Sequence, residues 1–458
     1  MGSGTVLFMW REQRLCGSAV VLAVLSALST LSTGCRGAEF RLAEGGGGSA
    51  PDTESCVPEP DSKVGADCGV FVRPGAAGDG SLAAPVGSIM EALALGERIY
   101  VCGDLADESI NISATAEIIG GLDCDSWAYD LDVRTELTAP AGQIPISIAP
   151  DATVIMSGFR IASRNALLDS GSSIAVIAQQ GSSVSFERCD IVAGNASAGA
   201  DGAPGVPGEP GEEGEPGTPS AGGTGGLSSC LSEGGKGGNA GTSPTANGST
   251  GLPAEQGNGG DLGCTMGGSG VPGMLGDNAL QFNPVPTIDA TGYSSEVGES
   301  GAIGTRGGGG GGGGGIVGAG GGGGGAGGCP GAGGGPGGFG GASIAIVSLG
   351  AALSFQDSTA FVGNGGDGGV GGVGGNGGLR GSAGSGYMSA CAGGDGGDGG
   401  AGGDGADGVG GPSLIVAYLG AEPSLNGLSV TAPSAGQAGQ SPSGDAAPAA
   451  TTLSFDDP

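Results

Sequence analysis

The sequence predicts an all-β fold: a parallel β-helix, or solenoid, interrupted by large glycine-rich insertions. Two observations indicate it. First, three apolar passages repeat one another across wide gaps: 173–195 (SIAVIAQQGSSVSFERCDIVAGN), 343–364 (SIAIVSLGAALSFQDSTAFVGN) and, more weakly, 413–430 (SLIVAYLGAEPSLNGLSV). Second, glycine fills the gaps and supplies 113 of the 458 residues. A repeat that tolerates insertions at one point is typical of stacked coils with loops leaving one corner.

The residues before the first repeat predict one short helix and several short strands. Residues 70–72 (VFV) predict a strand. Residues 86–95 (VGSIMEALAL) predict a helix, because Ile89 and Leu93 lie one helical turn apart and Gly96 ends the pattern. Brief β-branched runs between Gly, Asp, Pro or Ser predict further strands at 99–102, 110–113, 117–119, 144–148, 153–156 and 159–162.

This opening resembles the start of bacterial right-handed parallel β-helix proteins of the pectate-lyase-like kind. The resemblance is carried by Phe71-Val72-Arg73-Pro74, Gly78-Asp79-Gly80, Glu91-Ala92-Leu93, Ile99-Tyr100-Val101 and Gly120-Gly121-Leu122-Asp123. It covers residues 67–195 and the two later repeats. It implies a right-handed coil whose N-terminal end is capped by the short helix, which would cover an otherwise exposed strand edge.

Residues 1–34 are typical of an export signal, because Arg11 and Arg14 precede the apolar stretch 15–31. Cys35 follows small residues and resembles the lipobox cysteine of bacterial lipoproteins, although Ser32 stands where that motif usually has leucine. The resemblance implies a lipid on Cys35 that anchors the exported protein in the cell envelope, at the outer membrane or cell surface. Ordinary signal cleavage and an uncleaved anchor helix are the alternatives.

Composition divides the rest of the chain. The predicted parts are a polar tether at 35–66, N-terminal β-helix rungs at 67–195, a glycine-rich insertion at 196–341, a rung at 342–364, a second glycine-rich insertion at 365–411, a rung at 412–432 and a tail at 433–458. Both insertions follow a Gly-Asn pair, at 194–195 and 363–364, so both are expected to project from one side.

The two insertions have a period of three residues. The first opens at Gly202 with six G-x-y triplets that resemble collagen-like bacterial segments, and the second has glycine at two of every three places. This second pattern resembles the repeats of PGRS-type bacterial surface proteins. Period three is compatible with packed polyglycine II helices, and the low hydrophobicity is compatible with disorder. For the collagen-like triplets, a stiff solvated spacer and a triple helix between chains are the two alternatives.

Eleven cysteines in an exported chain favour disulfides. Cys16 lies in the signal and Cys35 is the lipid site. Local spacing favours the pairs Cys56–Cys68 and Cys102–Cys124, and the pairs Cys230–Cys264 and Cys329–Cys391 within the insertions. Cys189 is expected to be a buried free thiol. Zinc is disfavoured, because the chain has no histidine and no CxxC spacing.

The chemistry of the chain excludes several classes of function. A net charge of −32 disfavours a nucleic-acid partner, and the absence of histidine removes the commonest general base. Neither lysine, Lys63 or Lys236, falls on a predicted rung, so no catalytic residue is nominated. Residues 402–410 (GGDGADGVG) match a calcium-binding nonapeptide, which makes Asp404 and Asp407 candidate Ca²⁺ ligands, with a chance match as the alternative.

The sequence therefore predicts a non-enzymatic cell-envelope lipoprotein with a structural, adhesive or matrix role. Its partners would be the membrane, through the lipid anchor, and a glycan or another cell-surface molecule. It would carry no cofactor other than the candidate calcium. One alternative is a β-helix carbohydrate-binding or polysaccharide lyase-like protein, which rests on the resemblance of fold alone. The other alternative is a calcium-responsive surface binder.

Overall fold

The computed structural model describes residues 56, 62–253, 257–280, 285–430 and 447–456. The predicted signal 1–34, the lipid site Cys35, most of the tether, residues 431–432 of the last predicted rung and residues 433–446 of the tail lie outside these ranges. The described residues belong to one compact unit. Within them, no helix is long and apolar enough to cross a membrane.

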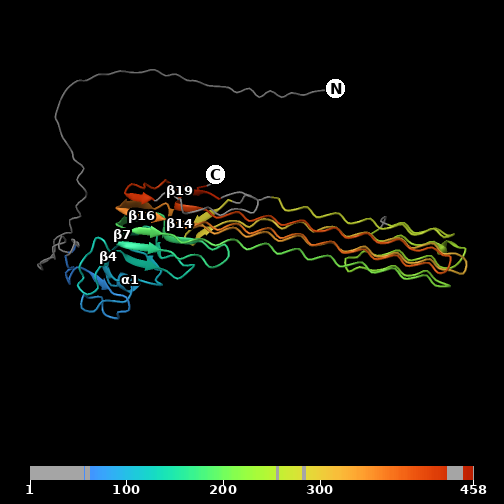
Figure 1. Ribbon diagram of the computed structural model, residues 1–458, viewed down its shortest axis with the longest axis horizontal. Coiled ribbons are helices and arrows are strands. Elements are labelled where there is room, and N and C mark those ends of the chain that lie inside the picture. The colour runs from blue at the N-terminus through green and yellow to red at the C-terminus, as the bar shows by residue number, and fades with distance from the viewer. Residues whose placement is uncertain (1–55, 57–61, 254–256, 281–284, 431–446, 457–458) are drawn as a thin grey trace, which may run out of the picture. The chain divides into compact units, whose positions relative to one another are not determined.

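The protein is mostly β, and its three main sheets are parallel (Figure 1). The first sheet contains β1 (Val70–Val72), β2 (Arg98–Cys102), β4 (Ala116–Leu122), β7 (Thr153–Ser157), β10 (Ser183–Glu187) and β15 (Ala352–Gln356). The second sheet contains β5 (Thr135–Thr138), β8 (Phe159–Ala162), β11 (Asp190–Val192), β16 (Ser358–Phe361) and β18 (Leu428–Val430). The third sheet contains β3 (Ile110–Ile112), β6 (Ile146–Ile148), β9 (Ser173–Ala178), β14 (Ser343–Leu349), β17 (Ser413–Leu419) and β19 (Ala449–Ser454).

The chain visits the three sheets in a fixed rotation. It runs through β7, β8 and β9, then β10, β11 and β14, then β15, β16 and β17. Ser343 pairs with Ser173 on one side and with Ser413 on the other, so the three sequence repeats lie in register as successive layers of one stack. The predicted all-β fold with parallel strands is therefore confirmed, and this topology is compatible with a β-helix-like fold.

The core lies between the three sheets. Side chains that alternate along the strands point inward, and Val154, Met156, Phe159 and Ile161 are all buried. Stacking continues between layers, since the rings of Phe186 and Phe355 lie 5.8 Å apart with nearly parallel planes. Full burial of one such aromatic or aliphatic side chain contributes about 1.5–3 kcal/mol.

One short helix, α1 (Ile89–Leu93), packs against the first layers. It begins at Ser88, whose hydroxyl accepts a hydrogen bond from the Glu91 amide, and it buries Ile89 and Ala92. The helix is shorter than the predicted 86–95, because Val86 instead forms a parallel bridge with Val72. Pairing of Val86 with the first sheet thus outweighs the helical pattern at that end.

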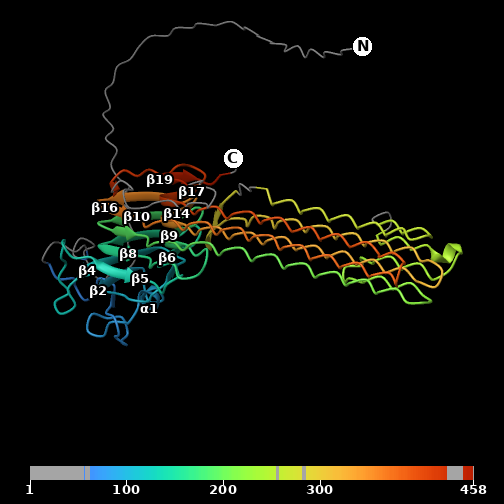
Figure 2. The ribbon, with the colours of Figure 1, turned by 45° about the vertical axis from the view of Figure 1, so that its right-hand side comes forward.

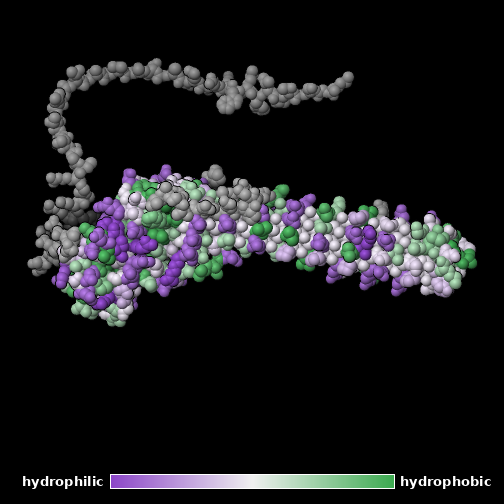
Figure 3. All heavy atoms as spheres, in the orientation of Figure 1, coloured by the Kyte–Doolittle hydropathy of each residue, from purple (hydrophilic) through white to green (hydrophobic). Residues whose placement is uncertain are grey.

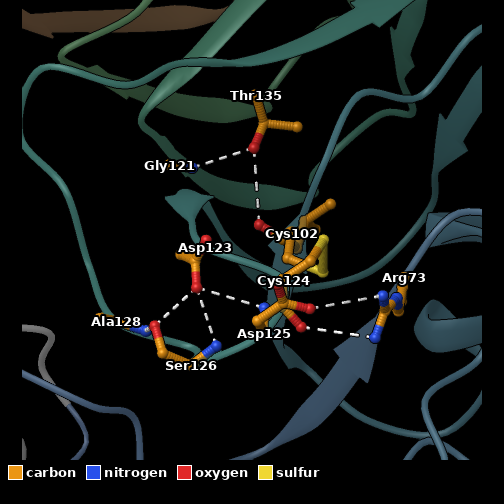
Figure 4. The surroundings of a disulfide bond; sticks show 10 residues. Arg73, Cys102, Gly121, Asp123, Cys124, Asp125, Ser126, Ala128 and Thr135 are labelled. Atoms are coloured by element: carbon orange, nitrogen blue, oxygen red, sulfur yellow. Dashed lines mark hydrogen bonds and ion pairs between the residues drawn. A yellow bond between two sulfur atoms is a disulfide. The ribbon is translucent and has the colours of Figure 1, made fainter.

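A disulfide and a tight corner fix the end of β4 (Figure 4). Gly121 has a positive φ of 75°, a conformation that glycine adopts without strain, and its amide donates to the Thr135 hydroxyl. One oxygen of Asp123 accepts hydrogen bonds from the Asp125 amide and from the amide and hydroxyl of Ser126. These bonds, the Ser126 hydroxyl first, lower the pKa of Asp123 below its usual value.

A hairpin from the first insertion returns to the sheets. Its antiparallel strands are β12 (Thr287–Asp289) and β13 (Gly292–Ser294). Ile288 of the hairpin is buried against a second apolar cluster on the third sheet, which includes Ile177 and Val347. The sequence did not predict this hairpin, which ties the insertion to the outer face of the third sheet.

Candidate functional site

Both insertions leave the sheets at one corner, between the second and third sheets. The Asn195 side-chain oxygen accepts a hydrogen bond from the Asn364 amide at 2.8 Å, and the Asn165 side-chain oxygen accepts one from the Asn195 amide at 2.7 Å. A Cβ on Gly194 would lie 2.7 Å from the Asn165 amide, so only glycine fits there. The shared Gly-Asn pair thus places the two exits at adjacent positions, as the sequence predicted.

Buried serines hold this corner from inside. The Ser343 hydroxyl donates to the Gly194 carbonyl at 2.8 Å and accepts from the Gly363 amide at 2.9 Å. Ser413, one layer further, donates to the Gly363 carbonyl at 2.8 Å. The strands β14 and β17 therefore each begin with a serine whose hydroxyl bonds the backbone at the exit of the preceding layer.

We expect Ser343→Ala to destabilise the protein by about 1–3 kcal/mol, because it removes two hydrogen bonds, to the half-buried Gly194 carbonyl and Gly363 amide, and each contributes about 0.5–1.5 kcal/mol. Urea unfolding followed by circular dichroism measures the change. Ser354→Ala is the matched control, since Ser354 is exposed and makes only one long bond, of 3.4 Å, to Val184. Equal unfolding midpoints for the two variants would contradict this role of Ser343.

Beyond the corner, the two insertions form a single bundle of long, nearly straight segments (Figures 1 and 2). We call the run 196–218 the edge segment, 299–316 and 319–342 the inner segments, and 364–386 and 391–412 the second-insertion segments. Shorter runs at 221–240, 245–253, 257–263 and 265–280 pack around them. The two glycine-rich insertions, for which the sequence left disorder open, therefore form an ordered arm of hydrogen-bonded segments.

Hydrogen bonds between the segments recur at every third residue. Along the edge segment, Gly199, Gly202, Gly205, Gly208, Gly211, Gly214 and Gly217 donate to the carbonyls of Asp367, Val370, Val373, Asn376, Leu379, Ser382 and Ser385, at 2.8–2.9 Å. Polyproline II chains have three residues per turn and no internal hydrogen bonds, so their amides are free to bond neighbours. This ladder of hydrogen bonds corresponds to the packed polyglycine II helices with which the three-residue period is compatible.

The central parts of the inner segments have neighbours on every side. Residues 307–315, nine consecutive glycines, are all buried, and so are residues 319–329. A Cβ on Gly324 would lie 2.0 Å from the Gly310 carbonyl oxygen, and one on Gly322 would lie 1.9 Å from that of Gly384. Real Cβ atoms do not approach this closely, so the lattice requires glycine at these positions.

Glycine content reports how many sides of a segment are covered. The inner segments use glycine at three places of each triplet where neighbours surround them. The segment 364–386 uses it at two, and its third residues are exposed, as at Val370 and Val373. The edge segment has glycine at only one of the three places of each triplet. Its G-x-y triplets therefore lie against neighbouring segments of this same chain, which differs from a solvated spacer.

Aspartate side chains complete the hydrogen bonding between the second-insertion segments. Asp404 Oδ1 accepts from the Gly374 amide and Asp407 Oδ1 from the Gly371 amide, each at 2.8 Å. Asp395 and Asp398 act in the same way further along the segment. Among the residues described here, no group of three or more acidic, cysteine or histidine side chains could hold a metal ion. Calcium binding at Asp404 and Asp407 stays a prediction.

We expect Asp404→Asn to preserve slow hydrogen exchange at the Gly374 amide and Asp404→Ala to lose it, because an amide oxygen still accepts the bond while a methyl group does not. Exchange measured by mass spectrometry checks this, with calcium titration of the same variants. If both variants exchange like the wild type, Asp404 does not hold that amide. Calcium uptake that both variants lose would instead support a calcium site.

Four disulfides join the eight candidate cysteines. Cys56–Cys68 and Cys102–Cys124 are the pairs that local spacing favoured. The predicted pairing in the insertions was wrong: the structure joins Cys230 to Cys329 and Cys264 to Cys391, across 99 and 127 residues. The reason is that adjacent segments in the bundle are distant in sequence, so closeness along the chain does not select the partner.

Cys189 is a free thiol with no exposed surface. Burial is the main cause that raises the pKa of this thiol, to about 12, so it stays protonated. Its sulfur donates to the Met156 carbonyl at 3.4 Å. It is therefore a packing residue of the core, as its place in the first repeat suggested.

Two arginines on or near the strands, Arg164 and Arg188, have local partners. Arg164 pairs with Asp107 at 2.7 Å, and both are well exposed. Arg188 lies over the Tyr129 ring and donates to the Leu131 carbonyl at 2.8 Å. These contacts give both arginines a structural explanation, and exposed ion pairs contribute little to stability.

One cleft opens on the outer face of the first sheet. It has a volume of about 290 Å³ and is lined by Glu97, Arg98, Thr115, Ala116, Glu117, Thr153 and Ile155. Arg98 and Glu117 form an ion pair of 2.5 Å within it. The cleft thus offers both charges and an apolar surface to a small ligand, and sequence reasoning did not find it.

Comparisons with protein-family models, with curated proteins and with solved structures found no match to this chain.

Proposed function

We propose that the protein is an exported, non-enzymatic cell-envelope lipoprotein, anchored through Cys35, that carries a stiff arm with a structural, adhesive or matrix role. In this proposal the three parallel sheets are the faces of a right-handed β-helix, with α1 as its N-terminal cap. The arm is the observation that carries the proposal. At roughly 3.1 Å per residue, the 23 residues of the segment 364–386 extend about 70 Å, which suits a spacer or a contact surface.

Three further features support this function. Disulfides form and persist in oxidising compartments, and two of the four lie in the arm. A net charge of −32 keeps the chain soluble and opposes self-association. The surface of the bundle is mostly pale on the hydropathy scale, with separate polar and apolar patches, so it is suited to water rather than to burial (Figure 3).

Export and anchoring are tested together. Metabolic labelling with a fatty-acid analogue is expected to label the wild type and not Cys35→Ala. Protease added to intact cells is expected to leave a resistant fragment that contains the sheets and the arm. An unlabelled wild-type protein that is also inaccessible inside the cell would overturn the proposal.

A second candidate function is glycan binding, and the cleft beside Arg98 and Glu117 favours it. A glycan array with wild type and Arg98→Ala tests it, because loss of the guanidinium removes a donor for carbohydrate hydroxyls. Specific binding that Arg98→Ala abolishes would support this candidate, and the absence of any bound glycan would exclude it. Chain cleavage of a bound polysaccharide would show an enzyme instead.

A further inference from the structure

The edge segment presents a row of prolines to solvent. Pro204, Pro207 and Pro210 are all exposed and recur at every third residue. One turn of polyproline II is three residues, so these rings lie on one side of the segment at intervals of about 9 Å. In Figures 1 and 2 this part of the chain, in green, follows the rim of the bundle. The prolines therefore form a straight, accessible row.

The hydrogen bonding of the arm explains why proline occupies these places. In each triplet the glycine amide donates to the segment 364–386, and the next residue's carbonyl accepts from an inner segment, as at Ala203 and Val206. The third residue has no backbone hydrogen bond within the described part of the arm. Proline, which lacks an N–H and presets φ, fits there without loss. The row is consequently held in its extended form before any partner binds.

Exposed apolar side chains of the segment 364–386 lie beside the row of prolines. Val370, Val373 and Leu379 are 51%, 64% and 72% exposed, and they belong to the neighbouring segment. The two rows are adjacent, since the Asp201 side chain accepts a hydrogen bond from the Val370 amide at 2.9 Å. We call Pro204, Pro207, Pro210, Val370, Val373 and Leu379 together the proline ridge. Such a grouped apolar surface on a soluble arm indicates a contact site.

Charge beside the proline ridge indicates the chemistry of its partner. Glu209, Glu212, Glu213 and Glu215 are all exposed on the same segment. A partner with lysine or arginine at the rim of its binding groove complements these carboxylates. A second copy of this chain does not, because its net charge is −32 and only 4% of its residues are aromatic.

We propose that the proline ridge is the docking surface for a partner protein whose groove is lined by aromatic side chains and rimmed by basic residues. Proline-rich chains in polyproline II form dock in such grooves, and a chain already fixed in that form loses little entropy on binding. The proposal gives the adhesive role proposed above a binding surface and rests on that function.

The test uses purified full-length protein in detergent and, as probe, a WW-type domain with two aromatic residues in its groove and arginines at its rim. Calorimetry is expected to show binding that weakens as salt increases. The variant Pro204→Ala/Pro207→Ala/Pro210→Ala is expected to bind at least tenfold more weakly. Pro272→Ala is the matched control and should bind like the wild type, because Pro272 is exposed but has no proline three residues away.

Protease resistance of the arm shows whether the triple variant is folded, and Val373→Lys offers a second way to block the ridge if it is not. No binding of the probe, or equal binding by the wild type and the ridge variants, would overturn the proposal. So would self-association that depends on the ridge. These outcomes are distinct from a failure of the proposed function, which is decided by lipid labelling and protease access in cells.

Discussion

Gly324→Ala is expected to loosen the arm while the three sheets stay folded. The added methyl carbon would lie 2.0 Å from the Gly310 carbonyl oxygen and 2.9 Å from that of Gly311, and both belong to the other inner segment. Neighbours on every side prevent relaxation, so the cost is at least the 1–3 kcal/mol of about one extra methylene in a packed core. Lower entropy of the unfolded chain offsets only about 0.4–1 kcal/mol of this.

Gly335→Ala is the matched control, since it makes the same change in the same inner segment. There the nearest atom to the new carbon would be the Ala203 amide nitrogen at 3.2 Å, a distance that a small shift relieves. Hydrogen exchange of the arm amides and limited proteolysis compare the two variants. Similar protection in both would mean that glycine is not required by close approach of the segments.

The layers of the stack could be predicted because their signal is local. Alternating buried residues give strands such as β7 and β10, and three serines at equivalent places, Ser173, Ser343 and Ser413, set the register between layers. The exit corner followed from the repeated Gly-Asn pair. In each case residues close in sequence determine which way a side chain faces, and the repeat then aligns one layer on the next.

Other elements depend on contacts that no short window of sequence contains. Strand β5 (TELT) has only Thr135 and Leu137 pointing inward, and its pairing with β8 decides its conformation. The hairpin β12–β13 forms because Ile288 finds an apolar surface on the third sheet. The order of the segments in the arm is likewise set by long-range packing, which is why the cysteine partners there could not be read from spacing.

Removing the longest-range disulfide, with Cys264→Ser and Cys391→Ser together, is expected to give the largest loss of stability among the four disulfide variants. In the chain-entropy model a loop of 127 residues corresponds to about 5 kcal/mol, against about 3 kcal/mol for the 12 residues between Cys56 and Cys68. The bond joins Cys264, which follows the run 257–263, to Cys391 at the start of the segment 391–412, so its loss removes a covalent link between the two insertions. Denaturant unfolding of each double variant measures the difference.

Peptide mapping of the wild type under non-reducing conditions provides the control, because it must first recover Cys264 linked to Cys391 and Cys230 linked to Cys329. The double variant Cys56→Ser/Cys68→Ser then reports the effect of a short loop in the sheets. If the two variants lose equal stability, loop closure is not what the arm disulfide contributes. If the mapping instead finds Cys230 linked to Cys264, the order of segments in the arm is wrong, because the structure places Cys230 beside Cys329 and Cys264 beside Cys391.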